Sequence, residues 1–311
     1  VTRIGARGWS VYARVESRDD TVEIGTGLVP SEEGGAERRT VRIDGAEAGG
    51  GAALAGLVAI DWLTPQMDRL FLESPSGRRR FLDRLVYGLI PEHARHVAAF
   101  EKAMRERQQL LRAGSTDTAW LSALETSMAE MGVVVAAARR EAMAKLDAAL
   151  AAGEGPFPRA IVSVTGYLED ALAAEPAVEV EDRYRAALAG SRQRDAESGT
   201  TALGPHRADL LARHGPKDMP AERCSTGEQK AILIAIVLAN ARLTAARRGV
   251  PPILLLDEIA AHLDTTRREA LAETILSLGA QAWLTGTDAA LFEGFRGSAR
   301  FLTVRDGRLV G

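Results

Sequence analysis

Hydrophobic and polar residues alternate with a period of two near the start of the chain, as they do in strands with one buried face. The alternation covers residues 8–15, 21–29 and 39–44, and the glycine-rich, charged stretches SEEGGAERR and GAEAGGG predict loops. The run LVAIDWL, residues 57–63, is apolar except at Asp61 and has the length of a buried strand. The first part of the chain is therefore predicted to be mainly β-structure.

The spacing of apolar residues becomes helical after Pro75. Residues 76–112 and 119–152 are rich in Ala, Leu, Arg and Glu, with apolar positions three and four residues apart. In the second segment these positions form one stripe, which is more typical of a helix packed on its neighbours than of a face that binds a partner. The stripe comprises Trp120, Leu124, Met128, Met131, Val135, Ala138, Ala142, Leu146 and Leu150.

Beyond the proline-containing stretch GEGPFP, strand-like and helix-like segments alternate. AIVSVTGY predicts a strand, residues 176–198 predict a helix, and TALGPHRADLLARH predicts further strands. A long apolar helix follows Ser225, and the strand ILLL after it is expected to be buried on both faces. Then come a helix from Thr265 to Leu278, the strand AWLTG, a short helix and a hairpin with the turn Asp306-Gly307.

These elements predict an α/β fold, with a mixed or parallel sheet, flanking helices and a helical insertion. We divide the chain into an N-terminal part of this fold at residues 1–75, a helical arm at residues 76–199 and an α/β lobe at residues 200–311.

Composition adds three constraints. The net charge of −3 gives no overall basic field, so a nucleic acid would have to be met by a local basic patch. Cys224 is the only cysteine and cannot form an internal disulfide, which favours a reducing, cytoplasmic setting. The apolar run 231–239 is too short to cross a bilayer, and the first residues contain no apolar signal core, so no membrane partner is expected.

Two acids, Asp257 and Glu258, directly follow the strand ILLL. Ligands of open α/β sheets bind at the carboxyl ends of the strands, and adjacent acids there suit the hydrolysis of a magnesium-bound nucleotide. Asp257 would contact Mg²⁺ and Glu258 would orient the attacking water. Two solvated acids at the end of a strand explain the pattern equally well.

The residues Ser225-Thr226-Gly227-Glu228 precede the long apolar helix and form a capping-box pattern. The same helix terminus offers free N–H groups and the positive end of the helix dipole, which suit a phosphate carried by another subunit. Asp264 likewise either caps the next helix or belongs to the site. His262 is interpreted as a structural or solvated residue.

A loop suited to hold the phosphates is missing from these 311 residues. A P-loop has the pattern Gly-x4-Gly-Lys-Ser/Thr, but the residues that precede the lysines are Glu101, Ala144, Pro216 and Gln229. The chain starts with Val and enters strand-like alternation at once. We therefore expect it to lack an N-terminal segment with this motif and to be unable to hydrolyse ATP alone.

In their order along the chain, three motifs resemble the C-terminal lobe of ABC-type ATPases. STGEQ, residues 225–229, is similar to the signature motif, ILLLDE to Walker B, and AHLD, which ends at Asp264, to the D-loop. Ile259 stands where transporters usually have Pro, and the interval from Ser225 to Asp257 is longer than in transporters. These features favour the DNA-repair members of the superfamily.

Two further segments resemble the RecF family of bacterial recombination mediators. SPSGRRRFLD, residues 74–83, is similar to that family's Ser-Pro-x-x-Arg-Arg-x-Phe-Leu-Asp segment, and GPHRAD, residues 204–209, to its Gly-Pro-His-Arg-x-Asp segment. The resemblance covers the chain from about residue 57 to its end.

The resemblance assigns a role to each motif residue. The signature, which would contact ATP across a dimer interface, consists of Ser225, Thr226, Gly227, Glu228 and Gln229. Asp257 would hold Mg²⁺, Glu258 would act in hydrolysis, and Asp264 would belong to the D-loop. Gln66 lies near the place of the family's glutamine loop, and Thr287 stands where transporters commonly have a histidine.

The resemblance also implies ATP and Mg²⁺ as cofactors, an ATP-dependent homodimer, DNA with a junction of single and double strands, and a RecR-type partner. Candidates for DNA contact are Arg78, Arg79, Arg80 and Arg84, which would otherwise form a solvated or salt-bridged helix face. Two alternatives stay open. One is a non-hydrolysing binding module that keeps only the signature face, and the other is an ABC transporter subunit bound to a membrane permease.

Overall fold

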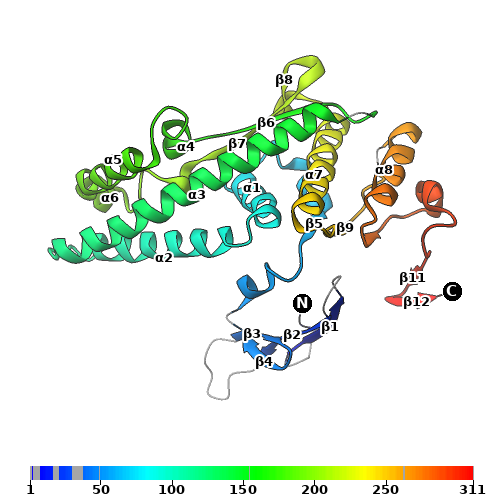
Figure 1. Ribbon diagram of the computed structural model, residues 1–311, viewed down its shortest axis with the longest axis horizontal. Coiled ribbons are helices and arrows are strands. Elements are labelled where there is room, and N and C mark those ends of the chain that lie inside the picture. The colour runs from blue at the N-terminus through cyan, green and yellow to red at the C-terminus, as the bar shows by residue number, and fades with distance from the viewer. Residues whose placement is uncertain are drawn as a thin grey trace. The chain divides into compact units, whose positions relative to one another are not determined.

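The computed structural model describes residues 2, 8–16, 21–29, 38–48, 50–153, 155–261 and 263–310. The chain forms two compact units, residues 1–59 and 60–311, and Figure 1 shows the course of the chain within each. His262 and most of the stretch SEEGGAERR lie outside the described residues.

The first unit is an antiparallel sheet in the order β1-β2-β3-β4. Its elements are β1 (Ser10–Glu16), β2 (Thr21–Val29), β3 (Arg38–Ile43), β4 (Ala46–Ala48) and the 3-10 turn η1 (Gly51–Leu54). The first three strands confirm the prediction. The loop predicted over GAEAGGG is wrong at residues 46–48, because Asp44 and Gly45 take φ angles of 49° and 81° and form a tight turn that pairs β4 with β3.

The second unit contains a parallel sheet in the order β10-β9-β5. Its strands are β5 (Ile60–Leu63), β9 (Ile253–Leu256) and β10 (Ala282–Leu284). In β9 the buried Leu254 and Leu256 alternate with Leu255, which is 40% exposed, and the register neighbours of Leu255, Trp62 and Trp283, are exposed as well. The prediction that ILLL is buried on both faces is therefore wrong for the described residues, and LVAIDWL likewise forms only the short strand β5.

Helix α7 (Thr226–Arg248) forms the centre of the larger hydrophobic core. It contacts α1 (Pro75–Leu89), α3 (Thr118–Ala152) and α8 (Thr265–Leu278). By length and composition α3 and α7 could each span a membrane, so the apolar run at 231–239 belongs to a longer apolar helix than the sequence analysis assumed. Much of the apolar surface of both helices is packed inside the protein, as in core helices of soluble proteins.

A second hydrophobic core lies between the first half of α3 and a set of shorter helices. These are α2 (His93–Arg112), α4 (Tyr167–Ala171) and α5 (Ala177–Gly190), and α6 (Arg192–Ser198) contacts α2 and α5. Figure 1 shows α3 running through both core regions. The stripe predicted on α3 is at least half-buried except at Trp120, which is 53% exposed. The helix predicted at 76–112 is broken between α1 and α2, at Pro91.

An antiparallel sheet in the order β6-β7-β8 leads from the helical region toward α7. The elements of this part are β6 (Ala160–Thr165), η3 (Pro205–Arg207), β7 (Asp209–His214), η4 (Gly215–Lys217), β8 (Met219–Pro220) and η5 (Ala221–Arg223). Only the end of the predicted strand TALGPHRADLLARH is therefore a strand. The chain closes with η6 (Ala289–Phe295) and the predicted hairpin of β11 (Thr303–Arg305) and β12 (Arg308–Val310).

Candidate nucleotide-binding site

Ser225 begins helix α7 with the predicted capping box. Its hydroxyl oxygen accepts a hydrogen bond from the Glu228 N–H at 3.4 Å, and the Glu228 carboxylate accepts one from the Ser225 N–H at 3.0 Å. Thr226 is exposed, and a Cβ added to Gly227 would have no neighbour within 4 Å. The cap therefore leaves the backbone of the first helical turn accessible to an anion, so the structural and the functional interpretations are compatible.

A cation lies beside this helix terminus. Lys217, in η4, forms an ion pair with the carboxylate of Glu228. The ion pair, together with the hydrogen bonds from Ser225, lowers the pKa of Glu228 to about 2, so this carboxylate is ionised at neutral pH. Gln229 points inward instead. It is 2% exposed, and its side-chain amide donates to the Cys224 carbonyl at 2.8 Å.

Asp257 and Glu258 lie at the carboxyl end of β9, and both are exposed. The Asp257 N–H still bonds to the Leu63 carbonyl at 2.9 Å, but Glu258 leaves the strand with a φ of 48°. A non-glycine residue in this left-handed region is strained and is held there by its surroundings. Thr285, after β10, supplies one holding contact, because its hydroxyl donates to Asp257 and accepts from the Glu258 N–H at 3.0 Å.

Lys230 supplies the second holding contact. This residue of α7 is 5% exposed, and its Nζ donates to the Glu258 carbonyl at 3.0 Å and lies 3.5 Å from the Asp68 carboxylate. Ser225 lies about 7.5 Å away along the helix axis, at a rise of about 1.5 Å per residue. One buried ammonium group therefore connects the signature end of α7 with the acid end of β9.

Sequence reasoning missed both Lys230 and Thr285. Lys230 directly follows the signature motif, but nothing in the local pattern indicates that its side chain reaches a residue 28 positions away. Of the residues after the strand AWLTG, Thr287 stands where transporters commonly have a histidine. Thr287 is exposed, and the contact with the two acids is made by Thr285 instead.

The remaining predicted site residues have local roles in the structure. Asp264 caps α8, where its carboxylate accepts from the Arg267 N–H at 2.9 Å. Gln66 lies in η2 (Pro65–Arg69), is exposed, and has no hydrogen-bond partner among the described residues. It stands two positions before Asp68, the partner of Lys230.

A magnesium ion at this site would rely mainly on the nucleotide for its ligands. Within the described ranges, no three His, Cys, Asp or Glu side chains come together in a metal site. Asp257 offers one exposed carboxylate, of which one oxygen accepts from Thr285. One carboxylate with phosphate oxygens and water is a ligand set that Mg²⁺ commonly takes, so the residues fit a nucleotide-bound ion.

The four arginines predicted to contact DNA do not form one open patch. Arg78 binds the Asp209 carboxylate through two hydrogen bonds of 2.8 and 2.7 Å, and its side chain is only 13% exposed. Arg84 lies 4.0 Å from the ring centroid of Trp62, and burial lowers its pKa to about 10. Both fit the alternative of a salt-bridged and packed helix face. Of the four, Arg80 is the exposed one.

The two segments that resemble the RecF family contact each other. The Arg78–Asp209 pair joins them directly. Asp83, in the first segment, accepts two hydrogen bonds of 2.8 Å from Arg139 of α3, which also donates to the Pro205 carbonyl in the second segment at 2.6 Å. These residue types are thus explained by their place in the junction of α1, α3 and β7.

Curated relatives match the chain over almost its whole length, although a scan against protein-family profiles finds no match. The DNA replication and repair protein RecF of Mesorhizobium japonicum is 52% identical over 306 residues, which are 97% of this chain and 80% of that protein. The chain belongs to the RecF family. The RecF of Rhizobium meliloti is 49% identical over 314 residues, which are 100% of this chain and 83% of that protein.

Solved RecF structures share the fold. A structure of the recombination mediator protein RecF with ATPrS superimposes with a TM-score of 0.80 at 18% identity and covers 98% of this chain and 80% of its own. A structure of RecF with ATP gives a TM-score of 0.76 at 19% identity, over 93% and 78% of the two chains. This likeness confirms the predicted α/β fold, an ABC-type ATPase head with a helical insertion.

Proposed function

We propose that this chain provides the signature-bearing side of a RecF-type ATPase that binds DNA in an ATP-dependent manner. The observation that carries the proposal is the connection, through Lys230, between Ser225 at the start of α7 and Glu258 at the end of β9. The solved structure of RecF with ATP supports ATP as the nucleotide. The name of the relatives, DNA replication and repair protein, supports DNA as the partner.

In this proposal ATP lies between two subunits. Its phosphates are held by a P-loop that these 311 residues do not contain, and the signature end of α7 approaches the γ-phosphate from the other side. Thr226 and Gly227 present first-turn N–H groups beside the Ser225 hydroxyl, Asp257 holds the metal, and Glu258 polarises the attacking water. Mg²⁺, when bound, neutralises charge on the phosphate oxygens.

Further parts of the proposal concern partners and organisation. Residues 76–199 form a helical arm that is inserted in the sequence between residues 1–75 and the lobe at 200–311. Closure on ATP produces a homodimer that recognises a junction of single- and double-stranded DNA in the cytoplasm. A RecR-type partner is supported by the RecFOR pathway named with the solved RecF structures. Gln66 and Asp264 lie on the nucleotide-facing surface.

A second candidate function is a binding module that uses the signature face without hydrolysis. The lack of a Gly-Lys phosphate loop in these residues favours it. Ser225 and Glu228 would then only cap α7, and the two acids would only end β9. Membership of the RecF family argues against the other alternative, a transporter subunit.

The test uses two variants in a RecF protein that contains this chain together with a P-loop. Ser225→Arg places a cation at a helix N-terminus, where the helix dipole disfavours it, and should abolish ATP-driven dimerisation while sparing ATP binding. Glu258→Gln keeps the shape of the side chain and should allow dimerisation while slowing turnover by roughly 10²–10⁴-fold. Sedimentation with and without ATP, and phosphate release, separate these outcomes.

Matched controls lie on α8. Ser277→Arg and Glu269→Gln make the same chemical changes at exposed positions outside the motifs and should leave both measurements unchanged. Dimerisation of the Ser225 variant with ATP, or normal turnover by the Glu258 variant, would assign these residues to a cap and a strand end only.

A further inference from the structure

A groove runs between helix α2 and the segment 199–207 that leads into β7. It consists of two adjoining hollows of about 420 Å³ and about 220 Å³, which share His206 in their walls. The larger hollow is lined on one side by α2, from Met104 to Arg112, and on the other by residues 199–201 and 206–207. The smaller hollow continues to the start of α1 and includes Arg79 and Arg80.

Four arginines on this groove have no acidic partner among the described residues. Arg79, Arg112 and Arg207 donate only to backbone carbonyls, those of Ala208 at 2.8 Å, Gly199 at 2.7 Å and Thr201 at 3.4 Å. Arg80 is exposed and makes no hydrogen bond or ion pair within the described part of the chain. These side chains therefore keep N–H donors for a ligand.

The acids of the groove are already paired. Asp83 accepts both hydrogen bonds from Arg139, and Glu101 lies 3.5 Å from the guanidinium of Arg105. The groove consequently carries a local positive excess in a chain of net charge −3. Burial, and after it the neighbouring Arg139 and Arg207, lower the pKa of Arg79, whereas the carboxylates of Asp209 and Asp83 raise it in part.

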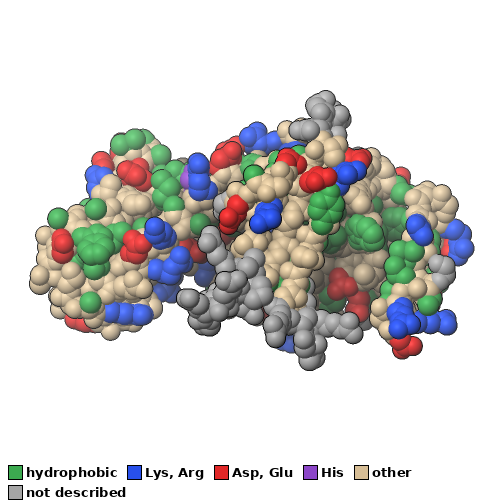
Figure 2. Space-filling view, turned by 90° about the horizontal axis from the view of Figure 1, so that it is seen from below, with side chains coloured by type: hydrophobic (Ala, Val, Ile, Leu, Met, Phe, Trp, Pro, Cys, Tyr) green, Lys and Arg blue, Asp and Glu red, His purple; other side chains and the backbone are tan. Residues whose placement is uncertain are grey.

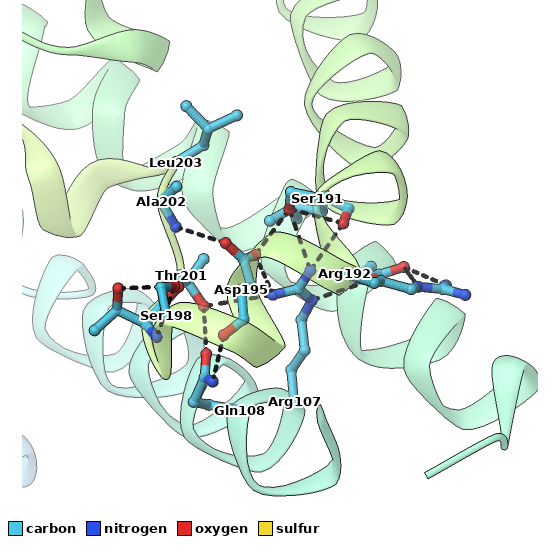
Figure 3. Close-up of polar contacts among 12 residues, drawn as sticks. Arg107, Gln108, Ser191, Arg192, Asp195, Ser198, Thr201, Ala202 and Leu203 are labelled. Carbon is cyan, nitrogen blue, oxygen red and sulfur yellow. Dashed lines mark hydrogen bonds and ion pairs between the residues drawn. The ribbon is translucent and has the colours of Figure 1, made fainter. Parts of the chain in front are cut away.

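A buried polar network holds the wall of the groove that is formed by residues 199–207 (Figure 3). Gln108, on α2, donates to the Asp195 carbonyl at 3.0 Å, and its side-chain oxygen accepts from the Thr201 hydroxyl at 3.4 Å. The Asp195 carboxylate accepts from Arg107 at 2.8 Å and from the Ala202 N–H at 3.1 Å. A wall held in this way positions Arg207 before any ligand arrives, which reduces the entropy lost on binding.

The cations are spread along the helix and are not gathered around one point. Arg105 and Arg112 are separated by about 10.5 Å along the axis of α2 at a rise of about 1.5 Å per residue, and Arg79 and Arg80 extend the row along the wall of the smaller hollow. Successive phosphates advance by about 3.4 Å along one strand of a duplex, so the row fits several phosphates of one backbone. Figure 2, viewed from the side of α2, shows Lys and Arg side chains gathered over the helical region, left of the centre.

We propose that this groove binds the sugar-phosphate backbone of DNA, with Arg79, Arg80, Arg112 and Arg207 as the contacting residues. The inference deepens the proposed function and rests on DNA as the partner. Arg79 and Arg80 remain candidates for DNA contact. Arg78 and Arg84, whose side chains are held by contacts within the protein, are replaced by Arg112 and Arg207. Because only phosphates are contacted, binding is independent of base sequence.

The test is the double variant Arg112→Glu with Arg207→Glu, in the chain as it stands. The probe is a fluorescent duplex with a single-stranded tail, and its anisotropy is followed at several salt concentrations without ATP. Loss of two phosphate contacts should weaken binding about ten-fold or more and reduce the slope of log affinity against log salt by about 1.8. Two unrelated duplex sequences should respond equally.

The control is the double variant Arg185→Glu with Lys145→Glu, which makes the same change of charge at a half-buried position on α5 and an exposed position on α3. It should keep the affinity and the salt slope of the unaltered chain. Circular dichroism and urea unfolding verify that each variant is folded, and the single variant Arg80→Glu gives an independent measurement at the other end of the groove.

Three results have distinct meanings. If the groove variants bind DNA as tightly as the control does, the groove is not the DNA-binding site, but the chain still binds DNA. If the unaltered chain does not bind the DNA at low salt, the groove and the proposed function fail together. If the groove variants lose DNA binding but ATP does not change the DNA affinity of a RecF protein with a P-loop, the groove is the DNA-binding site and the proposed ATP dependence is refuted.

Discussion

Replacing Arg107 by Met is predicted to destabilise the helical region strongly. The Arg107 side chain is fully buried and donates to Glu125 at 2.9 Å, to Asp195 at 2.8 Å and to the Leu188 carbonyl at 2.8 Å. These contacts join α2, α3, α5 and α6, as Figure 3 shows around its guanidinium group. Met has a similar length but supplies neither the charge nor the donors.

The expected loss of stability depends on the contacts that Glu125 and Asp195 keep after Arg107→Met. Glu125 keeps its ion pair with Arg192, whereas Asp195 is left with the hydroxyl of Ser191 and the Ala202 N–H as hydrogen-bond donors. Removal of one partner from a buried ion pair costs about 3–5 kcal/mol, because an uncompensated charge stays in a medium of low polarity. This loss is a large part of a typical total stability of about 5–15 kcal/mol.

Urea unfolding followed by circular dichroism measures the loss, with Arg185→Met as the control. Arg185 forms an exposed ion pair of 2.5 Å with Asp182 on α5, and such pairs contribute about 0–1 kcal/mol. The combination of Arg107→Met with Asp195→Asn should recover part of the loss, because the stranded charge is removed. A loss no larger than that of the control, or no recovery in the combination, would refute this reasoning.

Three further predictions concern single charged groups. Burial raises the pKa of Asp61 to about 6. The protonated carboxyl group therefore stabilises the fold below pH 4, and this contribution is lost as the pH rises through 6. In urea unfolding at pH 8, Asp61→Asn should raise the free energy of unfolding by about 3 kcal/mol at most. Lys217→Met should return the pKa of Glu228 from about 2 toward 4.5, as NMR titration would show. The ion pair stabilises above pH 4.5 and loses its effect as the pH falls toward 2, and because Lys217 is exposed the stability at pH 7 should change little. In a RecF protein with a P-loop, Lys230→Met should slow ATP hydrolysis by roughly ten-fold or more with little effect on nucleotide binding, because the Glu258 carbonyl loses its hydrogen bond from Lys230. Lys230→Arg should restore much of the rate. Equal losses of nucleotide binding and turnover would contradict a positioning role.

Local signals in the sequence determined the elements whose reasons are local. The capping box at Ser225, the helix Thr265–Leu278 and the turn Asp306-Gly307 were predicted correctly, because each depends on residues within a few positions of one another. The ABC-type lobe was predicted differently, from the resemblance of the signature, the strand ILLL and the two acids to known motifs. The break at Pro91 was also readable from the chain but was not predicted.

Only the tertiary structure decided which charged side chains are available. Arg78 and Arg79 are neighbours in the sequence, yet Arg78 is held by Asp209, 131 positions away, whereas Arg79 lines the groove. Lys230 likewise finds its partner Asp68 across 162 positions. Such pairings depend on how α1, α7 and β7 pack, and no local periodicity encodes them. Local patterns in the sequence account for most element types and for the chemistry at their ends, whereas packing between residues far apart in the sequence selects which of those groups face a ligand.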